Sequence, residues 1–237
     1  MIQVQSLTKN YGKVRALDQI SFDIKKGEVV GLLGLNGAGK TTCLRILTGY
    51  LIPSDGNCNV DGIDVFSNPV EIKRHIGYLP ETPPLYPELS VRDFLQFISR
   101  LRGIPEASFN EELNRVCELT ELKEVERTLI RNLSLGYKKR VGIAQAIIGS
   151  PPVLIFDEPV SGLDPRQIVE IRNLIRNLSG KHTVLLSSHI LTEVSRTCDR
   201  VIVIHRGKLA GDISGDQLGN IENIFLDLTK KSSEAGG

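Results

Sequence analysis

The 237-residue sequence contains no apolar run of the roughly eighteen residues that a membrane-spanning helix needs. Its N-terminus has no basic segment followed by an apolar one, so no signal peptide is expected. The formal net charge is only +1, which gives no indication of a nucleic-acid-binding tail. The four cysteines lie far apart, without the spacing of metal ligands or of a disulfide framework, and are expected to be buried, reduced thiols in a cytosolic protein.

The amino-acid composition is that of a globular protein, with 41% hydrophobic and 24% charged residues. The length exceeds that of a usual single domain but fits one α/β domain with an inserted subdomain. We therefore expect one domain over residues 1–229 and a flexible polar tail over residues 230–237.

A glycine-rich segment, residues 34–41, fits the phosphate-loop pattern, in which two glycines separated by four residues precede a lysine and a hydroxyl residue. The glycines let backbone N–H groups approach a polyphosphate, the lysine binds the outer phosphates and the hydroxyl binds Mg²⁺. A buried strand over residues 28–33 and a helix over residues 42–47 flank the loop, so the helix N-terminus faces the phosphates. A glycine-rich turn without a ligand is much less favoured. The candidate nucleotide-binding residues here are Gly34, Leu35, Asn36, Gly37, Ala38, Gly39, Lys40, Thr41 and Thr42.

The segment before this loop is predicted to form antiparallel strands, because Ile20, Phe22 and Ile24 alternate with polar residues. Tyr11 lies between these strands and could stack on a base, although covering a strand end is an equally good interpretation of this tyrosine. A further strand over residues 75–80 ends at its proline.

Residues 81–150 are predicted to be a helical insertion with its own surface for a partner. Ser90 with Asp93, and Ser108 with Glu111, have the spacing of capping boxes that begin two helices.

A third helix near the end of the insertion has Ser134 as its expected N-cap residue. Its N-terminus could bind an anion in the same way as the helix after the phosphate loop. Taken alone, an ordinary capped helix is the better interpretation of this stretch.

Two adjacent carboxylates, Asp157 and Glu158, follow a buried strand over residues 153–156. The carboxyl ends of parallel strands are where ligands bind in α/β sheets, so both acids are expected near the phosphates. Adjacent strand residues point in opposite directions, which suits two different roles, Asp157 on Mg²⁺ and Glu158 on the attacking water. Paired with a phosphate loop, this interpretation is favoured over two ordinary exposed acids.

The remaining third of the chain continues the α/β pattern. Asp164 is the expected N-cap of a helix that begins at Pro165. A strand over residues 183–187 is followed by His189, which could reach a γ-phosphate or the attacking water, although a lone histidine is more often structural. Two last strands are expected to finish the fold.

Together these motifs resemble the nucleotide-binding subunit of ATP-binding-cassette (ABC) transporters, over residues 2–228 and in the order typical of that family. The resemblance implies an α/β fold with a P-loop NTPase core of the RecA-like type, an N-terminal antiparallel β subdomain and the inserted helical subdomain. It also implies ATP and Mg²⁺ as ligands. The roles that it implies are adenine stacking for Tyr11, catalysis for Glu158 and His189, metal binding for Thr41, Asp157 and Glu81, and a dimer-loop position for Asp164.

The same resemblance implies a partner cassette, with a homodimer expected. The family's signature segment, here Ser134, Leu135, Gly136 and Tyr137, binds the γ-phosphate of ATP held by a second copy. The resemblance also implies a membrane-spanning partner subunit, which would place the chain on the inner face of the cell membrane.

Three positions depart from the family pattern. The usual signature is Leu-Ser-Gly-Gly-Gln, but Leu135 and Tyr137 replace one glycine and the glutamine. Glu81 replaces the glutamine that contacts Mg²⁺ and senses the membrane subunit, and a carboxylate can still bind Mg²⁺. Tyr78, Pro80 and the residues after them resemble the branch that serves ABC-2-type exporters, including gliding-motility-type systems.

The sequence thus predicts an ATPase subunit that powers a transporter through ATP-driven dimerisation, and no nucleic-acid partner. One alternative is a soluble ABC-type ATPase that acts on ribosomes or DNA, although such proteins usually carry two cassettes or long coiled coils, and none is present. A second is a regulatory cassette with weak hydrolysis. A GTPase or small-molecule kinase is disfavoured, because the sequence has no Asn-Lys-x-Asp base-reading motif.

Overall fold

The computed structural model describes residues 1–234 and contains two β-sheets. The first sheet is antiparallel with strand order β2-β1-β4-β5, and the second has the order β10-β9-β3-β8-β7-β6. The strands of the first sheet are β1 (Ile2–Tyr11), β2 (Val14–Ile24), β4 (Asp55–Val60) and β5 (Ile63–Asp64). Those of the second are β3 (Val29–Leu33), β6 (Ile76–Leu79), β7 (Val153–Phe156), β8 (Thr183–Ser188), β9 (Arg200–His205) and β10 (Lys208–Ser214).

The second sheet is parallel except at β10, which pairs antiparallel with β9. Its central strands are buried on both faces, and their side chains alternate between two hydrophobic cores. Leu154 and Phe156 of β7 enter one core, whereas Val153 and Ile155 enter the other. This explains why the sequence shows an uninterrupted apolar run here rather than an alternating one.

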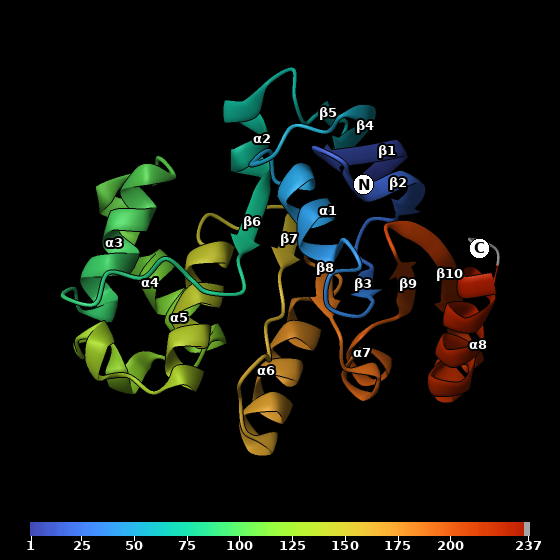
Figure 1. Ribbon diagram of the computed structural model, residues 1–237. Coiled ribbons are helices and arrows are strands. Elements are labelled where there is room, and N and C mark those ends of the chain that lie inside the picture. The colour runs from blue at the N-terminus through green and yellow to red at the C-terminus, as the bar shows by residue number, and fades with distance from the viewer. Residues whose placement is uncertain (235–237) are drawn as a thin grey trace.

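Helices cover the parallel sheet and extend to one side of it (Figure 1). A separate group, in green and yellow-green in Figure 1, consists of α3 (Val91–Leu101), α4 (Phe109–Leu119) and α5 (Leu135–Ile147). Short 3-10 turns connect these helices at Glu106–Ser108, Lys123–Val125 and Ile130–Asn132. The other helices are α1 (Lys40–Leu47), α2 (Pro69–His75), α6 (Pro165–Leu178), α7 (Leu191–Thr197) and α8 (Ile221–Glu234), the last preceded by a 3-10 turn at Gly215–Asn220.

The predicted caps of three helices are confirmed. The hydroxyl of Ser90 accepts the N–H of Asp93, that of Ser134 accepts the N–H of Tyr137, and the carboxylate of Asp164 accepts the N–H of Gln167. The predicted cap at Ser108 is wrong, because this residue already has helical backbone angles at the end of a 3-10 turn and its side chain makes no capping hydrogen bond.

The end of the chain also differs from the sequence prediction. The last strand does not finish the fold, because helix α8 follows it and packs its apolar residues Ile221 and Phe225 against the core. This helix continues to Glu234, so the first five residues of the predicted flexible tail are helical. The last three residues of that tail, 235–237, lie outside the described part of the chain.

Candidate nucleotide-binding site

The phosphate loop joins the end of β3 to the start of α1, and close backbone packing requires glycine at two of its positions, Gly34 and Gly39. A Cβ atom at Gly34 would lie 2.4 Å from the carbonyl oxygen of Ile204. Gly39 has a φ of 111°, which side chains other than glycine rarely adopt, and a Cβ there would lie 2.6 Å from the carbonyl oxygen of Ala16. The loop is therefore held closely against β2 and β9.

Lys40 begins α1 with a buried side chain that turns back over the loop. Its Nζ atom donates hydrogen bonds to the carbonyl oxygens of Gly34 at 2.8 Å and Leu35 at 3.4 Å. The same ammonium lies 3.4 Å from Oε1 of Glu158. A phosphate that enters the loop can therefore replace the carbonyl and carboxylate oxygens that surround this ammonium.

Asp157 and Glu158 lie directly after β7, where the sequence predicts them. Asp157 Oδ1 accepts a hydrogen bond from Thr41 Oγ1 at 3.3 Å and another from Ser187 Oγ at 2.6 Å. The Ser187 hydroxyl in turn accepts the backbone N–H of Glu158 at 2.9 Å. One buried hydroxyl on β8 therefore holds both acidic residues in place.

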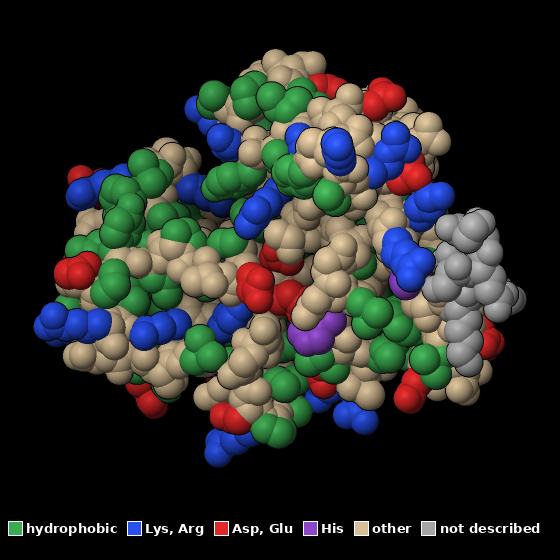
Figure 2. All heavy atoms as spheres, in the orientation of Figure 1, with side chains coloured by type: hydrophobic (Ala, Val, Ile, Leu, Met, Phe, Trp, Pro, Cys, Tyr) green, Lys and Arg blue, Asp and Glu red, His purple; other side chains and the backbone are tan. Residues whose placement is uncertain are grey.

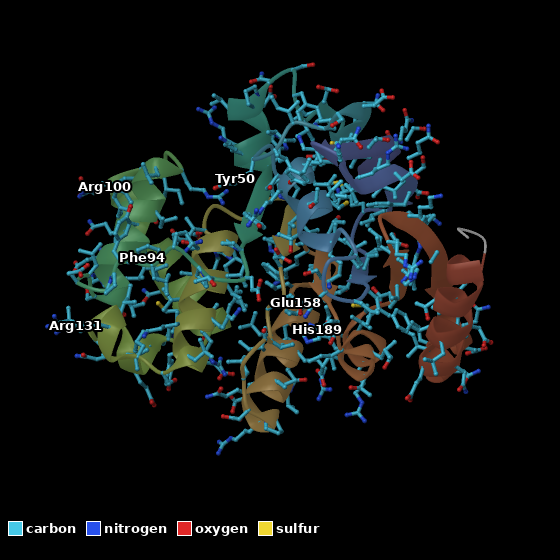
Figure 3. All side chains as sticks on the ribbon, viewed as in Figure 1. Tyr50, Phe94, Arg100, Arg131, Glu158 and His189 are labelled. Atoms are coloured by element: carbon cyan, nitrogen blue, oxygen red, sulfur yellow. The ribbon has the colours of Figure 1, made fainter. Side chains whose placement is uncertain are left out.

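The carboxylate of Glu158 also contacts His189, the second predicted catalytic residue. Its Oε2 atom lies 2.9 Å from Nδ1 of His189, which follows β8. Figure 3 shows these two labelled side chains next to each other at the centre of the molecule. Glu158 thus lies between a lysine and a histidine, with its own backbone in the left-handed region at a φ of 48°.

A polar hollow of about 600 Å³ brings most of the predicted site residues together. Acidic side chains and a histidine gather in a hollow at the centre of the face in Figure 2. The residues around this hollow are Ala16, Asn36, Gly37, Ala38, Gly39, Lys40, Thr41, Thr42, Glu81, Glu158, Ser161 and His189.

The signature segment lies elsewhere. Ser134, Gly136 and Tyr137 line a second hollow of about 520 Å³ between α5 and the start of α6. A Cβ at Gly136 would lie 2.8 Å from the end of the Gln167 side chain, so this glycine leaves room for the glutamine beside the start of α5. Leu135 is half exposed and approaches Gly162, in the loop that Asp164 ends. These residues do not reach the phosphate loop of their own chain.

Tyr11 does not line the polar hollow at the phosphate loop either. It borders a third hollow, of about 510 Å³, together with Tyr50, Tyr78 and residues of the 80–84 segment. The rings of Tyr50 and Tyr78 have centroids 5.7 Å apart. Burial, with a smaller contribution from the Asp157 carboxylate, raises the pKa of Tyr78 to about 12, so its hydroxyl stays protonated.

Two residues that hold the site were missed in the sequence. Ser187 reads as an ordinary residue at the end of a buried strand, and Lys139 as one of three consecutive basic residues on a helix. Both side chains are buried in the structure. Lys139 donates a hydrogen bond to the Glu158 carbonyl, whereas Ser187 donates one to the Asp157 carboxylate and accepts the Glu158 N–H. Only the order of strands β7 and β8 and the packing of α5 reveal their proximity.

Comparisons with known proteins identify the family. Residues 17–161 match the family described as ABC transporter. The chain belongs to this family. It is 38% identical over 230 residues to the bacitracin transport ATP-binding protein BcrA of Bacillus licheniformis, covering 96% of this chain and 74% of the relative. Among solved structures it is similar to the ATP-binding subunit of an ABC transporter, with a TM-score of 0.86, 30% identity, and coverage of 97% of this chain and 99% of the other.

A second similar structure is that of the bacterial ABC transporter cassette MJ0796 in its dimeric form. The similarity has a TM-score of 0.82 at 25% identity and covers 90% of this chain and 98% of that one.

These findings confirm the predicted family, fold class and enzymatic activity. The chain is the ATP-binding subunit of an ABC transporter and hydrolyses ATP. They leave no support for the GTPase and kinase alternatives or for a cassette that acts on ribosomes or DNA. Along residues 1–234, no helix combines the length and apolar character that crossing a membrane requires.

Proposed function

We propose that ATP binds with its phosphates in the hollow at the phosphate loop and that Glu158 positions the attacking water as general base. The observation that carries this proposal is the position of the Glu158 carboxylate, between Lys40 at 3.4 Å and His189 at 2.9 Å at the edge of the loop. The loop amides and Lys40 bind the β- and γ-phosphates. His189 stabilises the charge that develops on the γ-phosphate.

The residues present fit a magnesium ion. The hydroxyl of Thr41, which lines the hollow, lies 3.3 Å from the buried carboxylate of Asp157, and Glu81 lines the same hollow. No group of three or more His, Cys, Asp or Glu residues within the described chain could hold a metal by itself. This is the arrangement expected for Mg²⁺, which takes one or two protein ligands and completes its shell with phosphates and water. When bound, the ion neutralises charge on the phosphates.

A second copy of the chain completes the site in this proposal. The second hollow, at Ser134 and Gly136, is separate from the polar hollow at the phosphate loop of the same chain, so within one copy the signature residues have no phosphate to bind. A head-to-tail homodimer brings the two hollows together around two ATP molecules, and the dimeric MJ0796 cassette supports such an assembly. The half-exposed Leu135 and the loop capped by Asp164 then lie at the dimer interface.

Outside this dimer interface, we propose that a membrane-spanning subunit binds on the third hollow, at the inner face of the cell membrane. The exposed Tyr50 projects toward the helical group in Figure 3, and it shares this hollow with Pro80 and Thr82 on either side of Glu81. Glu81 therefore connects the partner surface to the nucleotide. Similarity to a relative named for bacitracin transport, together with the ABC-2-like motifs, supports an exporter, and bacitracin is the first compound to test.

Two measurements test this function. Steady-state ATPase activity of the purified chain distinguishes an active subunit from a regulatory cassette with weak hydrolysis, an alternative favoured by Leu135, Tyr137 and Glu81 at positions that usually carry other residues. Crosslinking in native membranes, followed by identification of the partner, should recover a membrane-spanning transporter subunit. Recovery of ribosomal proteins or DNA instead would contradict the proposal.

A further inference from the structure

Lys139 on helix α5 is buried, with only 2% of its surface exposed. Its Nζ atom donates hydrogen bonds to the backbone carbonyl oxygens of Glu81 at 2.6 Å and Glu158 at 3.2 Å. Burial lowers the pKa of this lysine, an effect that the carboxylates of Glu81, Asp157 and Glu158 oppose. A buried ammonium is costly unless hydrogen bonds satisfy it, and these two carbonyl oxygens supply them.

The Glu158 carbonyl belongs to a residue with an unusual backbone. Glutamate rarely adopts a positive φ, and such a conformation persists only where surrounding contacts enforce it. Ser187 Oγ holds the N–H of Glu158. On the other side, the carbonyl accepts hydrogen bonds from Lys139 Nζ and from the backbone N–H of Ser161, each at 3.2 Å.

The second carbonyl belongs to Glu81, where the chain leaves β6 and enters the helical part. Helix α5 packs closely on this segment one turn beyond Lys139. A Cβ at Gly142 would lie 2.6 Å from Leu79 and 2.9 Å from Pro83. A change in the orientation of α5 would therefore move the 79–83 segment and the Lys139 ammonium together.

We propose that Lys139 is a positioning residue that fixes the left-handed backbone of Glu158 and links its orientation to helix α5 and Glu81. The link is one buried ammonium between two carbonyls, and it acts through Glu158 without contacting ATP. The proposal rests on the proposed role of Glu158 as general base. It explains why a lysine is buried beside the acidic pair, where none of the family motifs quoted above assigns it a role.

The test compares two substitutions of matched length, Lys139→Met and Lys139→Gln, in the full chain. Methionine fills most of the space of the lysine side chain but donates no hydrogen bond, whereas glutamine has the same length as methionine and keeps a donor. We expect kcat for ATP to fall at least about tenfold in Lys139→Met and only about threefold in Lys139→Gln, because a displaced catalytic group lowers the rate steeply. KM and the affinity for a fluorescent ATP analogue should change less than about threefold, since the phosphate loop is intact. Lys138→Met, the same change at the neighbouring lysine of α5, is the control and should retain wild-type kcat.

Equal losses in the Met and Gln variants would show that only packing matters and would overturn the proposal. Wild-type kcat in Lys139→Met, or a loss confined to KM, would overturn it as well. If Lys139→Met does not fold, Lys139→Gln decides alone, and unchanged kcat in that variant contradicts the role. Glu158→Gln is measured in parallel: if it hydrolyses ATP normally, the proposed function fails, whereas its inactivity beside a fully active Lys139→Met refutes the positioning role only.

Discussion

Replacing Ser187 with alanine should both destabilise the protein and slow hydrolysis. The Ser187 hydroxyl is fully buried, donates to Asp157 Oδ1 at 2.6 Å and accepts the Glu158 N–H at 2.9 Å. A hydrogen bond to a charged group contributes about 1.5–3 kcal/mol, and a buried donor left without a partner costs about 1–3 kcal/mol. Since one hydroxyl serves both groups, we expect a total loss of about 3 kcal/mol in the free energy of unfolding.

In a domain of this size each kcal/mol lowers Tm by about 2–4 °C, so Ser187→Ala should unfold about 6–12 °C below the wild type. Its kcat should fall about tenfold or more, because Asp157 and Glu158 both lose their shared support. Differential scanning calorimetry and a steady-state ATPase assay measure the two effects. Ser195→Ala is the control, since that hydroxyl only bonds a carbonyl within its own helix. A Tm within about 2 °C of the wild type, or an unchanged kcat, would refute this reasoning.

Two further substitutions test the loop and the helical part. Gly39→Ala places a Cβ 2.6 Å from the Ala16 carbonyl oxygen at a φ of 111°, so titration with a fluorescent ATP analogue should show lost binding, while Gly219→Ala, in open space, should bind normally. Burial would raise the pKa of Glu112, but bonds from Arg115 and a backbone N–H lower it overall. The stabilisation by the ionised Glu112 carboxylate is present above its usual pKa of 4.5 and is lost as the pH falls through the lower pKa of the folded state. Urea unfolding should therefore show that Glu112→Gln is less stable than the wild type at neutral pH, and this difference should shrink in acid.

The sequence predicts the elements whose signals are local. Buried strands such as β7 appear as short apolar runs, and the caps at Ser90 and Asp164 lie at fixed spacing from the N–H groups that they accept. The cap at Ser108 fails because a 3-10 turn precedes α4 and already gives this serine helical backbone angles, which no spacing rule includes. Helix α8 was missed although Ile221 and Phe225 are four residues apart, a helical spacing, because the polar residues after them resemble a tail.

The candidate site likewise contains residues that the sequence predicts and residues that it does not. Lys40 follows from the fixed spacing of the phosphate-loop pattern, and Asp157 from its position at the end of a strand, because strand ends converge in a parallel sheet. Ser187 and Lys139 cannot be predicted from the local sequence, since each acts on a residue that lies 19 to 30 positions away in the chain. Their identification requires the pairing of β7 with β8 and the packing of α5 on the segment after β6.

The most direct measurement is the mass of Glu158→Gln in solution with ATP and Mg²⁺, by size-exclusion chromatography with light scattering. Glutamine keeps the shape of the side chain but cannot accept a proton, and loss of a general base lowers the rate by about 10²–10⁴. We expect the variant to bind ATP, to hydrolyse it at less than about a hundredth of the wild-type rate, and to form a dimer that is absent with ADP. Undiminished hydrolysis, or a monomer with ATP bound, would contradict the assignment of Glu158 and the site shared between two copies.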